Sequence, residues 1–300
     1  MSKTTDRPIV SVCMISYNHA AFITDAIESI LTQSIARQIE IVIGDDCSTD
    51  ETPAIIRNIA QSHPDINWQL NLRDKNVGVA VNFGETLLSC TGKYVAILEG
   101  DDFWTDERKL EKQIELLEKS PQSSTCFTLC KEVGEDDGSE KIVGNSRPNH
   151  FNLSYILKHG WFMRTPTLMF RRDVISELPS WFYSAYSTDY ILHVLFASGG
   201  GVIKLDEVTA VYRRHMGGVS IANVDKQMDR FIQKMDLLST IDDYFIHQFS
   251  HEIKFQKRSY YRALISYAWR YKRWHSGIIT HFSIDRKIAV LKMIWQKTWK

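Results

Sequence analysis

The sequence predicts an α/β protein whose mostly parallel sheet is flanked by helices, with a helical extension at its C-terminal end. Two observations predict this fold class. From residue 9 to about residue 119, apolar runs of strand length alternate four times with segments whose apolar side chains recur at helical spacing. The run at residues 94–98 is apolar throughout, as expected of a strand that is buried on both faces of a parallel sheet.

The elements of this first part follow one another as strand and then helix. Pro53 suits the first turn of one helix, and Pro121 lies beyond the end of another. The strands are expected at residues 9–15, 38–44, 68–72 and 94–98. The helices are expected to contain residues 22–31, to begin near Thr52, to end at Leu88 and to span residues 109–119.

The second half of the chain is less regular. Thr188 can cap a helix that the three glycines at residues 199–201 end. Cys126 and Cys130 are expected on one strand. Further strands are predicted at residues 167–170, 201–205 and 208–212, residues 134–149 are predicted to form a polar loop, and the chain after Gly218 is predicted to be helical to its end.

Polar side chains follow three of the predicted strands at the point where each strand ends. They begin at Ser16, at Asp45 and at Glu99. Each cluster alone is also typical of a helix cap or a turn. Because the carboxyl ends of parallel strands meet at one edge of a sheet, three such clusters favour a shared ligand site. Carboxylates are costly to bury alone, so the acids indicate a cation that brings a phosphate ligand with it.

Charge is unevenly distributed although the chain is neutral overall. Residues 251–300 hold twelve Lys or Arg, two acids and four of the eight Trp, which leaves residues 1–250 with a net charge of −10. The five Cys have no paired spacing, so no disulfide framework is expected. No apolar run reaches the length of a transmembrane helix, and residues 1–8 do not read as a signal peptide. A cytoplasmic location is therefore expected.

Four motifs carry a resemblance to a known family. They are the opening strand with Ser16-Tyr17-Asn18, the Asp-Asp-Cys-Ser-Thr-Asp-Glu-Thr run at residues 45–52, the Asn-Val-Gly turn at residues 76–78 and Glu99-Gly-Asp-Asp102. In this order they resemble the family 2 glycosyltransferases, inverting sugar transferases with the Rossmann-like GT-A fold. Glu99 stands where the family most often has Asp in its Asp-x-Asp metal motif.

The resemblance implies a role for each matching residue. Asp46 would accept a hydrogen bond from the uracil or thymine N–H, and Asp101 would be the chief ligand of a divalent metal, Mn²⁺ or Mg²⁺. The other residues implied to contact the nucleotide sugar or support its site are Ser16, Tyr17, Asn18, Asp74, Glu99, Gly100 and Asp102.

Two further positions lie after the metal motif. Asp189 resembles the family's catalytic base, although an acid at a helix start is also favoured by the helix dipole. His215 resembles the histidine that completes the metal site, although a lone His is more often structural. Arg213 or Arg214 would steady the departing diphosphate. The remaining histidines, His19 among them, are interpreted as structural.

The resemblance covers about residues 8–220. It implies a catalytic domain at residues 1–220, with a nucleotide-binding half at 1–120 and an acceptor-binding half at 121–220. The implied reaction moves a sugar from a UDP- or dTDP-sugar to a hydroxyl of a saccharide or lipid-linked saccharide, in cell-surface polysaccharide assembly. A catalytically inactive sugar-nucleotide-binding protein and a sugar nucleotidyltransferase are the alternatives. The latter usually needs a basic Gly-rich loop, which the residues after Ser16 do not offer.

Residues 221–300 form the predicted helical, basic and aromatic extension. Its cations and aromatic side chains suit packing against the catalytic domain, with long cationic side chains covering apolar surface. They equally suit residues 251–300 lying on the anionic inner face of a membrane, near a lipid-linked acceptor. Nucleic-acid binding is disfavoured by the acidic first 250 residues, and a homo-oligomer is left open.

Overall fold

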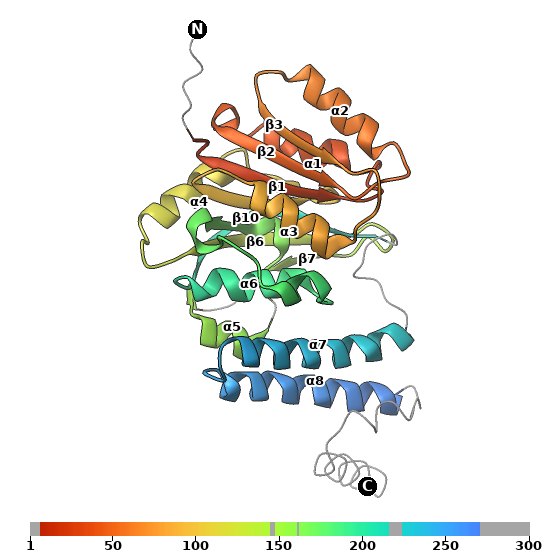
Figure 1. The fold of residues 1–300 in the computed structure, drawn as a ribbon, viewed down its shortest axis with the longest axis vertical. Helices are drawn as coiled ribbons and strands as arrows, with labels where there is room; N and C mark the ends of the chain where they lie inside the picture. Colours follow the sequence, from red (N-terminus) through yellow and green to blue (C-terminus); the bar gives the residue numbers. More distant parts are fainter. Residues whose placement is uncertain (1–6, 145–147, 161, 216–223, 271–300) are drawn as a thin grey trace, which may run out of the picture. The chain divides into compact units, whose positions relative to one another are not determined.

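The computed structural model describes residues 7–144, 148–160, 162–215 and 224–270. The chain divides into two compact units, residues 1–221 and residues 222–300, and each is considered by itself (Figure 1). Within the described residues, no helix combines the length and the apolar character needed to cross a membrane.

The first unit is built on a sheet whose opening part is parallel. β1 (Val10–Ser16) lies between β2 (Ile39–Asp45) and β4 (Tyr94–Glu99), and β3 (Asn67–Leu72) pairs with the outer edge of β2. All four strands run in one direction because a helix returns the chain to the same starting edge after each of the first three. The alternation predicted from the sequence is confirmed here.

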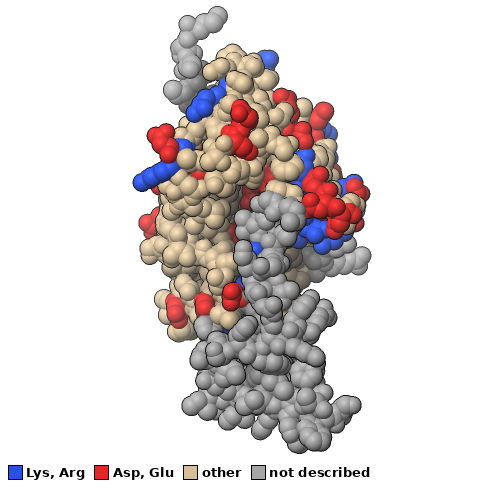
Figure 2. Space-filling view, turned by 90° about the vertical axis from the view of Figure 1, so that its right-hand side faces the viewer, with Lys and Arg blue, Asp and Glu red and all other residues tan. Residues whose placement is uncertain are grey.

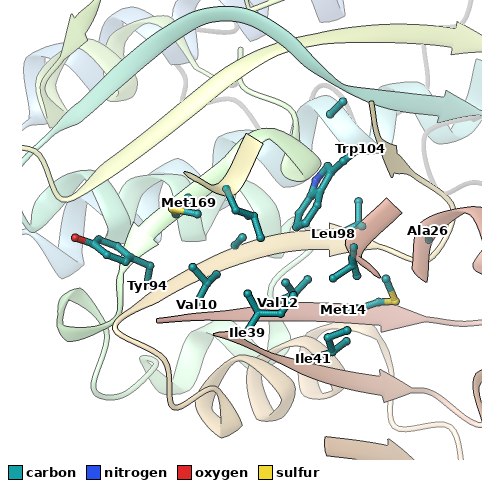
Figure 3. Packing of buried hydrophobic residues seen from close by; sticks show 14 of the residues in the cluster. Val10, Val12, Met14, Ala26, Ile39, Ile41, Tyr94, Leu98, Trp104 and Met169 are labelled. Atoms are coloured by element: carbon teal, nitrogen blue, oxygen red, sulfur yellow. The ribbon is translucent and has the colours of Figure 1, made fainter. Parts of the chain in front are cut away.

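Helices cover both faces of this sheet. Successive side chains of a strand point to opposite faces, so alternate residues of each strand pack against different helices. Val10, Val12 and Met14 of β1 pack into one core cluster with residues of α1 (Ile23–Leu31), α2 (Thr52–Ser62) and α4 (Lys109–Glu118) (Figure 3). The other face is covered by α3 (Val79–Ser89), which lies so close to β2 that a Cβ at Gly44 would meet the Thr86 hydroxyl.

The second part of the sheet is mixed in direction. β9 (Leu168–Arg171) pairs antiparallel with β4 and with β6 (Thr125–Gly134), and β10 (Val202–Arg214) runs parallel to β6. β5 (Phe103–Trp104) pairs antiparallel with β10. The remaining elements are β7 (Glu140–Val143), β8 (His150–Phe151), α5 (Leu153–His159), α6 (Thr188–Ser198) and the short 3₁₀ turns Ala36–Gln38, Thr165–Thr167, Arg172–Val174 and Ser180–Ser184.

Two of the strand and loop predictions for the second half are wrong. The predicted loop at residues 134–149 contains β7, which pairs antiparallel with β6. It is a short edge strand with exposed charged side chains, so it lacks the apolar alternation of a buried strand. The two strands expected at 201–205 and 208–212 are one strand, β10, with register shifts between Leu205 and Ala210. The Asp206-Glu207 pair lies in an irregularity of the ladder and not in a turn.

The second unit contains two paired helices, α7 (Val224–Tyr244) and α8 (Ser250–Arg270). Met235 and Leu264 form the centre of their contact, surrounded by aromatic side chains of both helices. The Ser250 hydroxyl contacts the carboxylate of Asp242 where the chain turns between the helices. The helical character predicted after Gly218 is thus found at residues 224–270, with a break at 245–249, while residues 216–223 and 271–300 lie outside the described range.

Candidate active site

The polar strand ends meet at one edge of the sheet, as the sequence predicts. Ser16 at the end of β1 lies opposite Asp45 of β2, and Ile15 lies opposite Glu99 of β4. The Ser16 hydroxyl donates a 2.8 Å hydrogen bond to the Asp45 carboxylate. The same carboxylate accepts the backbone N–H of Ser48 at 2.9 Å, which shapes the turn after β2.

The loops after β1 and β2 are joined residue by residue. Backbone Asn18 donates to the Ser48 hydroxyl at 2.8 Å, and the Asn18 side chain accepts from backbone Thr49 at 2.8 Å. Backbone His19 donates to the Thr52 hydroxyl at 2.9 Å, and the next N–H donates to Asp50 at 3.0 Å. Asn18 has a φ of 55°, a conformation that Asn tolerates better than most residues. The Asp/Ser/Thr run after β2 therefore holds the loop after β1.

Asp46 lies at the same edge but is buried. Its carboxylate accepts the backbone N–H groups of Val77 and Gly78 at 2.8 and 3.0 Å, and its carbonyl accepts from the Asn76 side chain. Asp46 thus fixes the Asn-Val-Gly turn, and a contact with a nucleobase would use the remaining lone pairs of these oxygens. Tyr17, 46% exposed, and Asp74, also exposed, border this region.

Three carboxylates gather where β4 ends. Oxygen atoms of Glu99, Asp101 and Asp102 lie within 4.8 Å of one another. Asp102 is fully buried; it accepts the backbone N–H of Arg213 at 2.8 Å, and its other oxygen, Oδ2, has no hydrogen-bond partner among the described residues. Gly100 allows this turn because a Cβ there would lie 2.9 Å from His19 Nδ1.

The proximity of these carboxylates alters their acidity. Burial, followed by the charges of Asp101 and Asp189, raises the pKa of Glu99 well above its usual value. Burial, with the charges of Asp101 and Glu99, does the same to the pKa of Asp102. Burial also opposes ionisation of Asp101, but hydrogen bonding to His215 and the charge of His19 outweigh it and lower its pKa. Of the three carboxyl groups, Asp101 is therefore the one whose pKa favours the ionised form before a cation binds.

Two histidines flank Asp101. His215, just beyond β10, places Nε2 3.1 Å from Asp101 Oδ2, and this hydrogen bond raises the pKa of His215. His19, in the loop after β1, places Nε2 3.8 Å from the same oxygen, and its pKa is lowered by burial. The ring of Phe22 lies against His215, with centroids 4.6 Å apart. The sequence predicted His215 here but not His19 or Phe22.

Arg213 contacts the turn after β4 that contains Asp101. Its guanidinium donates to the Asp101 carbonyl at 3.1 Å and to the Asp25 carboxylate at 2.6 Å, and lies 3.4 Å from Glu135. It also lies over the Phe22 ring. With only 8% of its side chain exposed, Arg213 would have to exchange these partners to contact a diphosphate.

Asp189 occupies the first turn of α6. The cap of this helix is Ser187 and not the predicted Thr188, which is the first helical residue. The Asp189 Oδ1 atom accepts from the Ser187 hydroxyl and from backbone Tyr190. The effect of its charge on the pKa of Glu99 places Asp189 near the carboxylate cluster, although it lies 90 residues later in the chain.

The carboxylate cluster fits a divalent cation. Hard oxygen ligands suit Mg²⁺ and Mn²⁺, and imidazole adds affinity for transition ions. Burial is the main cause of the raised pKa values of Glu99 and Asp102, and the neighbouring carboxylates add to it, while Arg213 offsets only part of the shift of Asp102. The unpartnered, buried Oδ2 of Asp102 is a sign of an unmet positive partner.

Known proteins are similar to this chain in sequence and in fold. The family model named glycosyl transferase family 2 matches residues 11–178, more than half of the chain. Uncharacterized protein Rv1520 of Mycobacterium tuberculosis is 34% identical over 212 residues, which is 70% of this chain and 60% of that protein. The putative teichuronic acid biosynthesis glycosyltransferase TuaG of Bacillus subtilis is 40% identical over 135 residues, 44% of this chain and 51% of that protein. The chain thus spans about 60% of the length of its mycobacterial relatives.

Solved transferases have the same architecture. The mannosyltransferase PcManGT of Pyrobaculum calidifontis, in complex with GDP-Man and Mn²⁺, matches 99% of this chain and 82% of its own, with a TM-score of 0.63 and 20% identity. Residues 1–349 of S. aureus TarS, in complex with UDP-GlcNAc, match 94% of this chain and 79% of their own, with a TM-score of 0.62 and 17% identity. These likenesses identify the fold as GT-A, and the family match over residues 11–178 shows that the chain belongs to glycosyl transferase family 2.

Proposed function

We propose that this chain is an inverting glycosyltransferase that moves a sugar from a UDP- or dTDP-sugar to a hydroxyl of a saccharide or lipid-linked saccharide. The observation that carries the proposal is the convergence of three carboxylates at the end of β4 with Asp189 of α6. One group of acids suits a metal-bound diphosphate, and a separate acid nearby suits proton removal. Family membership over residues 11–178 supports this assignment.

The donor would lie across the ends of β1, β2 and β4. The joined loops after β1 and β2 form a fixed border, where Tyr17 is exposed and could cover a base or ribose. TarS and PcManGT are described with UDP-GlcNAc and GDP-Man, so sugar nucleotides bind proteins of this fold. A uracil or thymine base is proposed from the Asp-Asp motif that contains Asp46.

The leaving diphosphate would sit beside Asp101. Asp101 and His215 would hold a divalent ion, Mn²⁺ or Mg²⁺, with Glu99 and Asp102 in support. When bound, such an ion neutralises the negative charge that develops on a departing diphosphate. The hydrogen bond between Asp102 and backbone Arg213 keeps the end of β10, which His215 follows, against the turn that contains the carboxylates.

Asp189 would act as the general base. Both donors that contact it meet the same oxygen, Oδ1. Among the described residues, no donor contacts Oδ2, so this oxygen is suited to accept the proton of an attacking acceptor hydroxyl. Attack from the face opposite the leaving group would invert the anomeric configuration. Proton removal by a general base contributes on the order of 10²–10⁴-fold to the rate.

Polysaccharide assembly is the proposed setting. TuaG is named for teichuronic acid biosynthesis, and the chain shares 40% identity with it over 135 residues. A cytoplasmic, peripheral membrane enzyme would meet a lipid-linked acceptor at the inner membrane face. Among the described residues on the face that Figure 2 shows, acidic and basic side chains are interspersed and form no continuous basic field of the kind expected for nucleic-acid binding.

The deciding experiment measures release of free nucleoside diphosphate from a panel of UDP-, dTDP- and GDP-sugars, with Mn²⁺, Mg²⁺ or chelator. We expect turnover of a UDP- or dTDP-sugar that requires metal and is lost in Asp101→Asn. Asp65→Asn, which alters an exposed carboxylate paired with Arg37, is the matched control and should retain turnover. The anomeric configuration of the product, read by NMR, tests inversion.

The alternatives give different results in the same experiment. A thermal shift with a sugar nucleotide but no turnover with any acceptor extract would indicate the inactive binding protein; saturation at 100 times Kd adds about 2.7 kcal/mol. Formation of a sugar nucleotide from a nucleoside triphosphate and a sugar phosphate would indicate the nucleotidyltransferase.

A further inference from the structure

His19 occupies a fixed position beside the carboxylate cluster. Its backbone N–H donates to Thr52, and its carbonyl accepts the N–H groups of Phe22 and Ile23 where α1 begins. The side chain is 18% exposed, and Nδ1 is buried without a hydrogen-bond partner among the described residues. The ring therefore projects from a loop that hydrogen bonds hold in place, and its Nε2 atom faces Asp101.

The position of Nε2 matches that of a metal ligand. Two ligands bound side by side to one ion at about 2.1 Å lie about 3 Å apart, and at wider angles up to about 4 Å apart. Asp101 Oδ2 lies 3.1 Å from His215 Nε2 and 3.8 Å from His19 Nε2. Both distances fall within this range, although neither histidine is near the other in sequence.

The two rings also lie at a suitable separation. An imidazole bound through Nε2 has its centre about 3.2 Å from the ion, so two rings on opposite sides of one ion are about 6.4 Å apart. The centroids of His19 and His215 are 6.4 Å apart, with planes at 83°. Among the described residues, the ligand atoms within 4.8 Å of one another are those of Glu99, Asp101 and Asp102, so both histidine side chains would have to rotate to bring their Nε2 atoms to one ion.

We propose that His19 is a second imidazole ligand of the metal that Asp101 and His215 hold, which makes the site mixed in nitrogen and oxygen donors. The inference rests on the proposed function, because it concerns the metal of that site. It goes beyond the metal motif at residues 99–102, since His19 lies in the loop after the opening strand.

The second imidazole sets a metal preference. Imidazole raises affinity for Mn²⁺ and more strongly for Co²⁺, whereas Mg²⁺ prefers oxygen ligands and retains its waters. His19→Gln should therefore weaken Mn²⁺ and Co²⁺ binding by at least about 10- to 100-fold, the range typical for loss of a group that only hydrogen-bonds to a metal ligand. Mg²⁺ binding should change less, so the preference for Mn²⁺ over Mg²⁺ should narrow.

The test counts nitrogen ligands directly, in the full chain without acceptor. Pulsed EPR of bound Mn²⁺, with and without UDP, reports ¹⁴N couplings from coordinated imidazole. We expect couplings from two nitrogens in the unsubstituted chain, from one in His19→Gln and in His215→Gln, and from none in the double variant. His63→Gln is the matched control, because His63 caps the C-terminal end of α2 and its ring Nδ1 lies 3.0 Å from the Ile59 carbonyl.

Each outcome is decisive. A single nitrogen coupling that is lost only in His215→Gln would overturn the assignment of His19 and leave the proposed function intact. Weaker Mn²⁺ binding in His19→Gln with both couplings retained would also overturn it. Absence of any Mn²⁺ binding, with or without UDP, would overturn both the ligand assignment and the metal-dependent function. Melting of the metal-free variants at the unsubstituted temperature confirms that they are folded.

Discussion

The backbone N–H of Arg213 donates a 2.8 Å hydrogen bond to the buried carboxylate of Asp102, which lies 111 residues earlier in the chain. This bond joins the end of β10 to the turn after β4. Because His215 follows Arg213 by two residues, the bond determines how close His215 comes to Asp101. The turn after β4, which contains the carboxylates, and the end of β10, which precedes His215, are therefore held together as one structural unit.

Substitutions of Asp102 should separate its structural and chemical roles. Asp102→Ala leaves the Arg213 N–H buried without an acceptor, so we expect the free energy of unfolding to fall by about 1–3 kcal/mol. Asp102→Asn keeps an acceptor oxygen and should unfold near the unsubstituted temperature, yet lose metal-dependent turnover because a negative charge is removed. Chemical denaturation and nucleotide release measure the two effects. Equal stability of the two variants would contradict the structural role.

Asp189→Asn should reduce catalysis and spare binding. The amide oxygen can still accept from Ser187 and Tyr190, so the start of α6 should be retained. The amide cannot take a proton at neutral pH, so kcat should fall by about 10²-fold or more with donor binding nearly unchanged. Steady-state kinetics and calorimetric titration of the donor decide the matter. If donor binding collapses while kcat holds, Asp189 is a binding residue.

The hydrogen bond between the loops after β1 and β2 predicts that substitution of Thr52, which is fully buried, alters donor binding. Thr52→Val removes the acceptor of the His19 N–H while keeping the side-chain shape, so the loop after β1 should loosen. We expect KM for the donor to rise more than kcat falls, and the free energy of unfolding to drop by about 1–3 kcal/mol. Thr52→Ser restores the hydroxyl and should recover both values. A valine variant with unchanged KM would mean that this bond does not shape the donor site.

A buried lysine predicts a pH dependence of stability. Burial lowers the pKa of Lys109 to about 7, while its amine donates to Gln113 at 2.6 Å and lies over the Trp104 ring. Between about pH 7 and pH 10 the unfolded chain binds a proton that the folded chain does not, so this residue makes stability rise with pH. Below pH 7, the cost is on the order of 5 kcal/mol.

Lys109→Met should therefore stabilise the folded chain at pH 7 and destabilise it at pH 10. At pH 7 the variant avoids the cost of the amine and should unfold at higher temperature than the unsubstituted chain. At pH 10 that cost is nearly gone, and the lost bond to Gln113 should leave the variant less stable by about 1–3 kcal/mol. Lys119→Met, at an exposed site just after the same helix, is the control. A stability difference that is constant from pH 7 to pH 10 would refute the assignment.

The basic extension predicts binding to anionic lipid. Residues 271–300 lie outside the described residues, so the prediction rests on sequence alone. Chains ending after Gly277 lack Trp295, Trp299 and the neighbouring lysines. The full chain should co-sediment with vesicles of rising anionic content in a salt-sensitive way, and the shortened chain should bind more weakly. Equal, negligible binding of both would leave the extension as a packing element.

The first half of the fold could be predicted because its signals are local. Strands such as β4 are apolar throughout, and helices such as α1 carry apolar residues at helical spacing, so each element is specified by its own residues. The direction of successive strands then follows from the helix between them, which brings Ser16, Asp45 and Glu99 to one edge. The sequence by itself therefore determined the parallel core and the location of the candidate site.

The remaining features depend on contacts between distant residues. β7 exists because an edge of β6 offers it hydrogen bonds, and the irregular ladder of β10 follows from its pairing with β6. The approach of His19 to Asp101 depends on the packing of the loop after β1 against the loop after β2. The ion pair of Arg213 with Asp25 likewise joins two elements that no local pattern relates. Only the tertiary structure decided these contacts, because side-chain neighbours across a sheet edge are set by packing and not by sequence spacing.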